Sequence, residues 1–399
     1  MDAEELTAWL RLALTPGVGN DTGRRLLAAF GLPQAIFNQS SAALRQFVSA
    51  AQASALAVSP DGLDAKVRAA EIWLADAEAG QGRALVTLGD PRYPASLLAI
   101  EDPPLMLYLV GQIRLLDAEP DRPATVDKAA NGWPERALAM VGSRNPTPQG
   151  EQNARQFARA LSGAGLTVVS GLALGVDGAA HEGALAGCDE NAPATRLATL
   201  AVVGTGADRV YPRQHRELAH RIAAHGLIVS EFPLGTPPLP ANFPKRNRLI
   251  AGLAQGTLVV EAAPQSGSLI TARLASEQGK EVFAIPGSIH SPQSRGCHAL
   301  IRQGAKLVET AEDVLEELRW PYAPMTVDQT APESAGADVQ TDDEAALLGA
   351  LGADPVGLDA LQARTGLDTA TLQARLLALE LDGRVGRLPG GLFQRLGWA

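Results

Sequence analysis

The sequence is poor in cysteine and contains no long apolar run. Its 399 residues include only two cysteines, Cys188 and Cys297, which lie far apart without a His or Cys at ligand spacing. This pattern supports neither a disulfide framework nor a zinc site, and it fits a reducing cytoplasm. No stretch approaches ~18 uninterrupted apolar residues, and residues 1–15 carry acidic side chains where a secretory signal peptide is basic. We therefore predict a cytoplasmic protein that does not insert into membranes, and we expect no metal or other cofactor.

The chain also lacks an overall positive charge. It has 34 Lys and Arg against 44 Asp and Glu, a formal net charge of -10, and its aromatic content is only 4%. The hydrophobic fraction of 46% excludes a wholly disordered chain, and the length suggests two or three domains with a sizeable core. Because the balance is acidic, the surface is not evenly coated with positive charge, and any nucleic-acid site must be local.

The two ends of the chain have the patterns of small helical domains. Residues 1–80 have the apolar spacing of short helices, and they predict a domain similar to sterile-alpha-motif or helix-hairpin-helix domains. Its tight turn at residues 16–19 can present N–H groups to a phosphate, although most such turns are only connectors. Residues 320–341 predict a linker, because they are rich in Pro and Ala and have no period. Residues 342–399, with three helical segments and a hairpin, predict a winged-helix domain.

Residues 81–319 have the alternating pattern of an α/β domain. Short apolar runs that predict strands buried on both faces are Leu138–Val141, Thr167–Val169, Leu200–Val203, Leu227–Val229, Leu258–Val260, Val282–Ile285 and Lys306–Val308. Helical patterns between the runs supply parallel crossovers, so we predict a doubly wound, extended Rossmann-like sheet. Its ligand is expected outside the carboxyl ends of the strands, where glycine-rich loops follow.

Three of these loops have the residues of anion cradles. Glycines allow close approach of the backbone, and hydroxyl and N–H groups at a helix start attract a phosphate. An arginine adds a bidentate fork. The loop residues that we predict to contact a ligand are Gly142, Ser143, Arg144, Ser170, Gly171, Ser266, Gly267 and Ser268. Any one such loop is weak evidence, because Thr147 can simply begin a helix while Arg144 pairs with a neighbouring carboxylate.

The most basic stretch of the chain follows the fourth predicted strand. Residues 232–260 contain three basic residues and no acidic one, although the whole chain is acidic. An isolated run of charge is usually a solvated face. Here an aromatic ring adjoins the cations, and this combination is what an unpaired base and its phosphate require. The predicted contacts in this stretch are Phe243, Lys245, Arg246, Asn247 and Arg248.

Two pairs of residues also permit a catalytic interpretation. Asp177 and His181 are spaced as an acid/base pair or metal ligands, but we favour an Asp that stabilises a helix start and a His that packs beside it. Glu231 and Glu261 both end strands, and we favour ion pairs with Arg246 or Arg248 over paired catalytic carboxylates. The sequence has no P-loop, and no dinucleotide-binding glycine motif follows the first predicted strand, so nucleotide hydrolysis is unsupported.

The loops together resemble the DprA (Smf) DNA-processing family. The similar blocks, which cover most of residues 137–310 in order, are MVGSRNPTPQG, SGLALGVDGAAHEGAL, GTGADRVYPRQH, SEFPLGTPPLPANFPKRNRLIAGL and VVEAAPQSGSLITARLASEQGKEVFAIPG. The chain departs from the family pattern at His215, where an asparagine is usual, and at Leu174, where some members are basic. Residues 188–196 look like an extra polar loop.

The resemblance implies a non-catalytic protein that binds single-stranded DNA, forms homodimers and loads RecA onto incoming strands during natural transformation. It assigns the DNA pocket to Arg144, Arg213, Phe243, Lys245, Arg246, Asn247 and Arg248, and the dimer interface to His298, Ile301 and Leu307.

Two further expectations concern the tail and a rival function. Residues 341–399 contain five Arg and eight Asp and Glu, a charge of -3. Since phosphate neutralisation dominates DNA affinity, we predict that this tail contacts a protein and does not read duplex DNA. The rival is a Rossmann-like enzyme that cleaves nucleoside monophosphates at the N-glycosidic bond. Its PGGxGTxxE motif is present only as far as Pro286 and Gly287.

Overall fold

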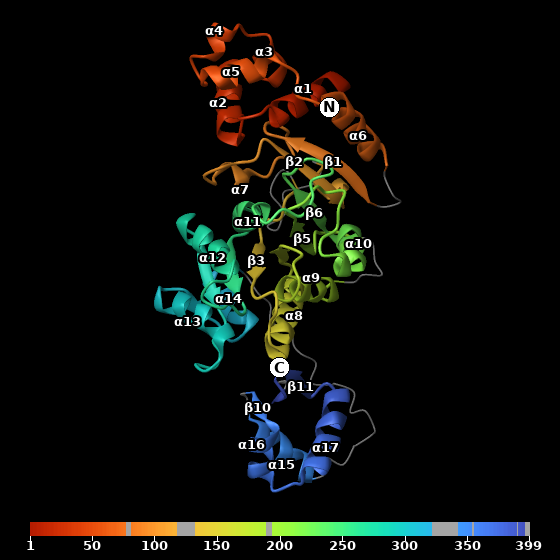
Figure 1. Cartoon of the computed structure of the whole chain (residues 1–399), viewed down its shortest axis with the longest axis vertical. Coiled ribbons are helices and arrows are strands. Elements are labelled where there is room, and N and C mark those ends of the chain that lie inside the picture. The colour runs from red at the N-terminus through yellow and green to blue at the C-terminus, as the bar shows by residue number, and fades with distance from the viewer. Residues whose placement is uncertain are drawn as a thin grey trace.

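The computed structural model in Figure 1 describes most of the chain. The described residues are 1–76, 81–117, 132–188, 194–320, 342–352, 355–388 and 390–395. The predicted linker at residues 320–341 lies outside the described residues except for Trp320, and so do residues 189–193 of the polar loop.

Six helices form the N-terminal part of the chain, in agreement with the apolar spacing. They are α1 (Ala3–Leu14), α2 (Asn20–Phe30), α3 (Pro33–Phe37), α4 (Ser41–Leu44), α5 (Ala50–Ala57) and α6 (Leu63–Ala75). Helix α1 begins at Asp2, whose carboxylate accepts the N–H of Glu5 at 2.8 Å, and residues 15–19 turn the chain into α2. The apolar faces of these helices share one core, in which Trp9 and Leu26 are fully buried.

A nine-stranded sheet occupies the centre of the described chain. Its strands are β1 (Gly82–Thr87), β2 (Met106–Gly111), β3 (Ala137–Val141), β4 (Thr167–Ser170), β5 (Thr199–Val202), β6 (Leu227–Ser230), β7 (Gly256–Val259), β8 (Glu281–Ala284) and β9 (Lys306–Leu307). Their order is β1-β2-β6-β5-β4-β3-β7-β8-β9. All seven predicted strands are present and parallel, but β1 and β2 are additional and pair antiparallel at one edge.

Helices cover both faces of the sheet and close two of its cores. Along the chain these helices are α7 (Ala95–Leu98), η1 (Ile113–Leu115), α8 (Pro148–Gly163), α9 (Val176–Ala186), η2 (Arg213–His215), α10 (Arg216–His225), α11 (Asn242–Leu253), α12 (Ser268–Glu277), η3 (Pro292–Ser294), α13 (Arg295–Arg302) and α14 (Ala311–Glu317). Helices α8, α9 and α14 pack on one face, and α7, α11, α12 and α13 pack on the other. The direction of winding reverses at β3, so the loops after β3 and β7 diverge at the switch point, where doubly wound sheets bind ligands.

The C-terminal part has the predicted winged-helix pattern. It contains α15 (Asp342–Leu351), β10 (Val356–Gly357), α16 (Leu358–Thr365), α17 (Thr369–Leu381), β11 (Val385–Leu388) and β12 (Leu392–Arg395). The three helices and the hairpin occupy the predicted segments, and only the short strand β10, paired with β12, is additional. The hairpin contacts α8 of the central part, at the lower end of that helix in Figure 1.

Two features of the described residues concern membrane insertion and metal binding. None of their helices is both long and apolar enough to cross a membrane. Within the same residues, no three His, Cys, Asp or Glu side chains gather as they would around a metal ion.

Candidate functional site

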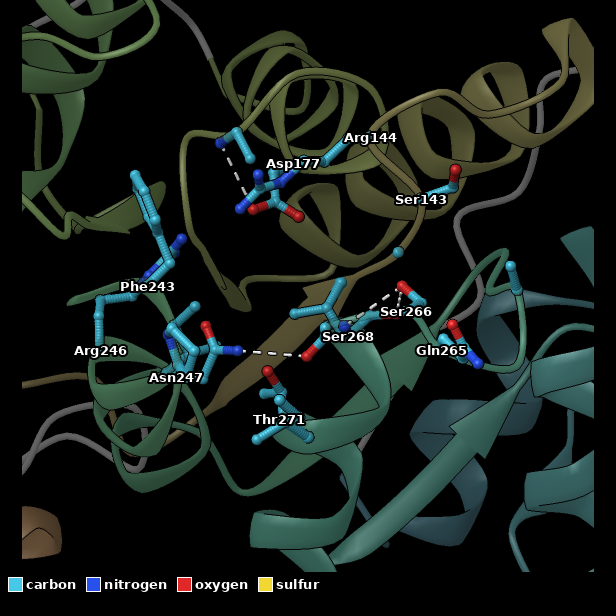
Figure 2. A pocket seen from close by; sticks show the side chains of 18 of the residues that line it. Ser143, Arg144, Asp177, Phe243, Arg246, Asn247, Gln265, Ser266, Ser268 and Thr271 are labelled. Carbon is cyan, nitrogen blue, oxygen red and sulfur yellow. Dashed lines mark hydrogen bonds between the residues drawn. The ribbon is translucent and has the colours of Figure 1, made fainter. Parts of the chain in front are cut away.

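A groove of about 750 Å³, which we call the first groove, opens at the switch point of the sheet (Figure 2). Its lining includes the loop after β3, the start of α9, the start of α11 and the loop before α12. The predicted residues that it brings together are Gly142, Ser143, Arg144, Phe243, Arg246, Asn247, Ser266, Gly267 and Ser268. The doubly wound topology therefore brings residues 142–144 against residues 243–247 and 265–268, which lie far away in the sequence.

An exposed cation and two aromatic rings form one wall of the first groove. The Arg144 guanidinium lies over the Phe243 ring, 5.2 Å from its centroid. The Tyr211 ring lies 5.8 Å from the Phe243 ring at an interplanar angle of 36°, and 46% of Tyr211 is exposed. A planar base can stack against these rings while Arg144 holds its phosphate.

A smaller pocket of about 90 Å³ adjoins this wall and shares Arg144, Tyr211 and Phe243 with it. Gly171 and Leu174 also line this pocket. Leu174 gives the pocket an apolar wall, and Gly171 leaves the space that the Arg246 guanidinium fills. A Cβ atom on Gly171 would stand 1.5 Å from Nη1 of Arg246, so only glycine fits there.

Arg246 lies at the floor of the first groove and is almost completely buried, with 3% of its surface exposed. Its Nη1 donates a hydrogen bond to the carbonyl oxygen of Val202 at 2.9 Å, which ties α11 to the end of β5. Burial lowers the pKa of Arg246 to about 10, and the nearby Asp177 carboxylate opposes this shift. Burial raises the pKa of Asp177, which the charge of Arg246 opposes. Arg246 is thus a positioning residue with its guanidinium under the groove, whereas the sequence predicted an open phosphate contact.

Asp177 and His181 have the structural roles that we favoured. Asp177 accepts a long hydrogen bond of 3.4 Å from the N–H of Ala173 at the start of α9. His181 is completely buried, with Nδ1 2.7 Å from the hydroxyl of Thr199, and burial lowers its pKa to about 3. A neutral, enclosed imidazole cannot exchange protons with a ligand in the groove. Asp177 and His181 therefore do not act together as the acid/base pair that their spacing permits.

The wall opposite Arg144 carries hydroxyl and amide groups. The hydroxyls of Ser266 and Ser268 lie 2.7 Å apart at the start of α12, and Nδ2 of Asn247 donates to the carbonyl oxygen of Gly267 at 3.2 Å. Figure 2 shows these bonds facing the groove. These hydroxyls lie at the helix start where the sequence predicts an anion cradle. Ser143, across the groove, is largely buried, and its hydroxyl accepts the N–H of Asn145 at 3.1 Å.

Besides Gly171, which lines only the smaller pocket, four predicted contact residues lie outside the first groove. Ser170 is completely buried, and its hydroxyl donates to the carbonyl oxygen of Met140, so we leave it out of the interface. Arg248 points to the other side of α11 and pairs with Glu231 and Asp102. Lys245 and Arg213 are exposed, but neither lines the first groove: Lys245 faces a neighbouring groove, and Arg213 follows the pocket residue Pro212.

The two strand-ending glutamates differ in role. Glu231 pairs with Arg248, as predicted. Glu261 pairs with neither predicted arginine: its two carboxylate oxygens accept the N–H and the hydroxyl of Thr147, at 2.9 and 2.6 Å. Thr147 in turn caps α8 by accepting the N–H of Gly150 at 3.0 Å. Both carboxylate oxygens of Glu261 are therefore engaged in this cap, and through Thr147 they fix the loop that carries Arg144.

Replacing Glu261 with Ala is expected to lower the free energy of unfolding by about 1–3 kcal/mol, because Thr147 loses both partners in a half-buried place. Glu261→Gln keeps an acceptor oxygen and is expected to lose less. Chemical denaturation monitored by circular dichroism measures both variants. Equal stability of Glu261→Ala and the unmodified protein would contradict this role.

The first groove also contains residues that the sequence does not predict. Tyr211 lines it and Arg213 does not, although an aromatic residue next to a proline and a basic residue is a usable signal. Gln265 and Gln293 also line the first groove, and Gln293 donates to the carbonyl oxygen of Asn145 at 3.3 Å. Gln293 lies more than a hundred residues from its partner, so no local pattern could indicate it.

The predicted dimer residues lie together at the β9 edge of the sheet. Leu307 is 44% exposed on β9, which pairs only with β8 among the described strands. His298 and Ile301 are half-buried on α13, and Nε2 of His298 lies 3.0 Å from the carbonyl oxygen of Gly287. This edge offers unpaired backbone groups and an apolar side chain.

Fold and site together define a class: a Rossmann-like sheet protein with a groove at its switch point and a winged-helix domain after it. The chain matches the family model described as DNA recombination-mediator protein A over residues 129–319, and the DprA winged helix domain over residues 329–391. It is 40% identical over 304 residues to Protein Smf of Escherichia coli, covering 75% of this chain and 74% of that protein. The chain therefore belongs to the DNA recombination-mediator protein A family, whose members are also called DprA or Smf.

Two comparisons with a Streptococcus pneumoniae protein agree. The chain is 41% identical over 231 residues to its DNA processing protein DprA, covering 58% of this chain and 73% of that protein. The X-ray structure of DprA from this organism superposes with a TM-score of 0.61 at 31% identity, and it covers 79% of this chain and 98% of that one. The predicted fold class and family are confirmed.

Proposed function

We propose that this protein binds single-stranded DNA in the first groove and mediates recombination by delivering the strand to RecA. The observation that carries the proposal is the wall on which the exposed guanidinium of Arg144 stacks over Phe243 beside Tyr211. It offers one phosphate contact and one stacking platform side by side. Every nucleotide has a phosphate for the cation and a base for the stacking platform, whereas a free anion would use only the cation.

The shape of the site favours an unpaired strand over a duplex. Phe243 and Tyr211 can stack only on a base whose face is open, and in a duplex every base is already stacked on its neighbours. We therefore expect recognition through stacking and phosphates, with little preference for sequence.

The candidate acids and bases favour binding without catalysis. Glu261 has both oxygens in the α8 cap, Glu231 is paired with Arg248, and His181 is enclosed. None of these three lines the first groove, and Asp177, the carboxylate that does, lies largely buried beside the Arg246 cation. We therefore propose a non-enzymatic protein that acts in the cytoplasm, and the rival N-glycosidase would need Glu261 to leave its cap.

Affinity for single strands is expected to fall with salt at a slope of log K against log salt near ~-3, if about four phosphates are neutralised. Fluorescence anisotropy with labelled oligonucleotides across a salt series measures this slope. A duplex of the same sequence is the control, and it is expected to bind more weakly at every salt concentration. Equal affinity for both forms, or a flat salt response, would count against the proposal.

We also propose that the protein forms a homodimer through the β9 edge. The chain is further proposed to consist of four regions, residues 1–80, 81–319, 320–341 and 342–399. The exposed Leu307 and the open edge support the homodimer. We also propose that the winged-helix domain contacts a protein partner. Its recognition helix, α17, carries a single basic residue, Arg375, and the hairpin that would form the wing contacts α8 instead of standing free.

A further inference from the structure

A second groove of about 660 Å³ runs on from the first, on the other side of α11. Pro244 and Ile270 line both grooves, so the two are continuous across this ridge. The far end of the second groove is formed by the turn between α1 and α2, where Val18, Gly19 and Asn20 line it. The second groove thus joins the Rossmann-like sheet to the N-terminal helices.

The charges in the second groove leave one cation unpaired. Its two acids, Asp102 and Glu231, are held by arginines: Arg24 donates to Asp102 at 2.8 Å, and Arg248 bridges Asp102 and Glu231. Among the described residues, Lys245 at the ridge has neither an ion pair nor a hydrogen bond. Two cations and two carboxylates line the second groove. Because Arg248 and the neighbouring Arg24 already hold both carboxylates, the charge left unpaired is that of Lys245, beside the first groove.

The floor of the second groove is apolar near this cation. Ile270 is 41% exposed, and Leu274 and Met106 continue the floor toward the turn at Gly19. An apolar floor next to an unpaired ammonium group fits a chain that carries flat apolar bases on a charged backbone. The same surface suits an acidic peptide less well, because an acidic peptide has no bases to stack on the rings of the first groove.

We propose that the strand bound in the first groove continues over Pro244 and Ile270 into the second groove, with a phosphate at Lys245, and reaches the α1–α2 turn. This inference rests on the proposed function and extends it: the N-terminal helices become part of the DNA interface. The protein then holds a longer strand than the first groove alone can cover, and the two parts of the chain grip it together.

The test adds a charge at the far end of the second groove without disturbing the fold. Gly19 precedes α2 in an extended conformation, with φ at -90°, and a Cβ atom there meets nothing within 4 Å. Both Asp and Asn are good residues at this position before a helix. Gly19→Asp therefore places a negative charge in the groove, and Gly19→Asn is its neutral control of the same size.

Anisotropy with oligothymidylates of about 6 and about 20 nucleotides, on the full chain, distinguishes the two grooves. The longer strand is expected to bind Gly19→Asp at least about threefold more weakly than Gly19→Asn, while the shorter strand binds both equally. For the unmodified protein, the salt slope of the longer strand is expected to be more negative by ~0.7 for each added phosphate contact. Asp102→Asn, which removes an acid from the groove, is expected to tighten binding of the longer strand only.

Equal affinity of the two Gly19 variants for the longer strand would overturn the inference. An equal loss for both lengths would also overturn it, because the added charge would then act on the first groove from a distance. If the shorter strand fails to bind the unmodified protein, the proposed function itself fails, and that result is separate from either outcome at Gly19.

Discussion

Replacing Arg246 with Ala is expected to lower the free energy of unfolding by about 3–5 kcal/mol. Only 3% of the surface of Arg246 is exposed, and its guanidinium holds α11 to β5 by donating a hydrogen bond to the carbonyl oxygen of Val202. Its removal leaves that carbonyl without this donor and leaves Asp177 in the interior without its cation. Chemical denaturation measures the loss, and a change below about 1 kcal/mol would show that the guanidinium is not structural.

The loss at Arg246 is expected to depend on pH. Burial holds the pKa of Asp177 above its value in the unfolded chain, so its stabilising contribution is present at low pH and is lost as pH rises through the raised pKa. Without Arg246 this pKa rises further, because the charge that opposed the shift is gone. Arg246→Ala is therefore expected to be more destabilised at about pH 8 than at about pH 5. Asp177→Asn in the same chain is the matched control, and it should recover part of the stability and abolish the difference.

Removing both Arg144 and Phe243 is expected to weaken binding of single-stranded DNA by about 2–5 kcal/mol, roughly thirtyfold to several-thousandfold. A stacked base contributes about 1–3 kcal/mol, and a hydrogen bond to a charged group about 1.5–3 kcal/mol. Arg144 is exposed, Phe243 is half-buried, and neither belongs to a hydrophobic core of the described residues, so the fold is expected to persist. Anisotropy gives the affinities, and circular dichroism checks the fold.

The losses of binding free energy in the two single variants are not expected to add up to the loss in the double variant. Arg144 stacks on Phe243, so each side chain holds the other in place, and a double-mutant cycle should show coupling. Arg302→Ala is the matched control, since Arg302 is an exposed arginine on α13 away from both grooves. A double variant that binds as tightly as this control would mean that the strand lies elsewhere.

Most of the sheet could be predicted because its strands are buried on both faces. Runs such as Leu138–Val141 and Leu258–Val260 are apolar at every position, which is typical of parallel central strands. The antiparallel strands β1 and β2 are not among the predicted strands, although Ala84–Val86 and Met106–Val110 are apolar at every position. Only β1 is an edge strand, and β2 joins it to β6, whose residues lie more than a hundred positions further along the chain.

The loops of the site could be predicted from the sequence, but the roles of the cations could not. Arg246 and Arg248 are two residues apart on a helix, so they point in different directions. Arg246 lies at the floor of the first groove, and Arg248 faces the second groove. Whether a cation is already neutralised depends on distant residues: Asp102 lies 146 positions before Arg248. Only the fold shows that Arg144 and Lys245 form no ion pair with the described residues of this region.

A crystal structure with a short oligothymidylate tests the central claim most directly. We expect a base against the rings of Phe243 and Tyr211, its phosphate at Arg144, and the next phosphates along Ser266 and Ser268 at the start of α12. A strand bound along the winged-helix domain, or anywhere that leaves the Arg144 and Phe243 wall unoccupied, would contradict the account.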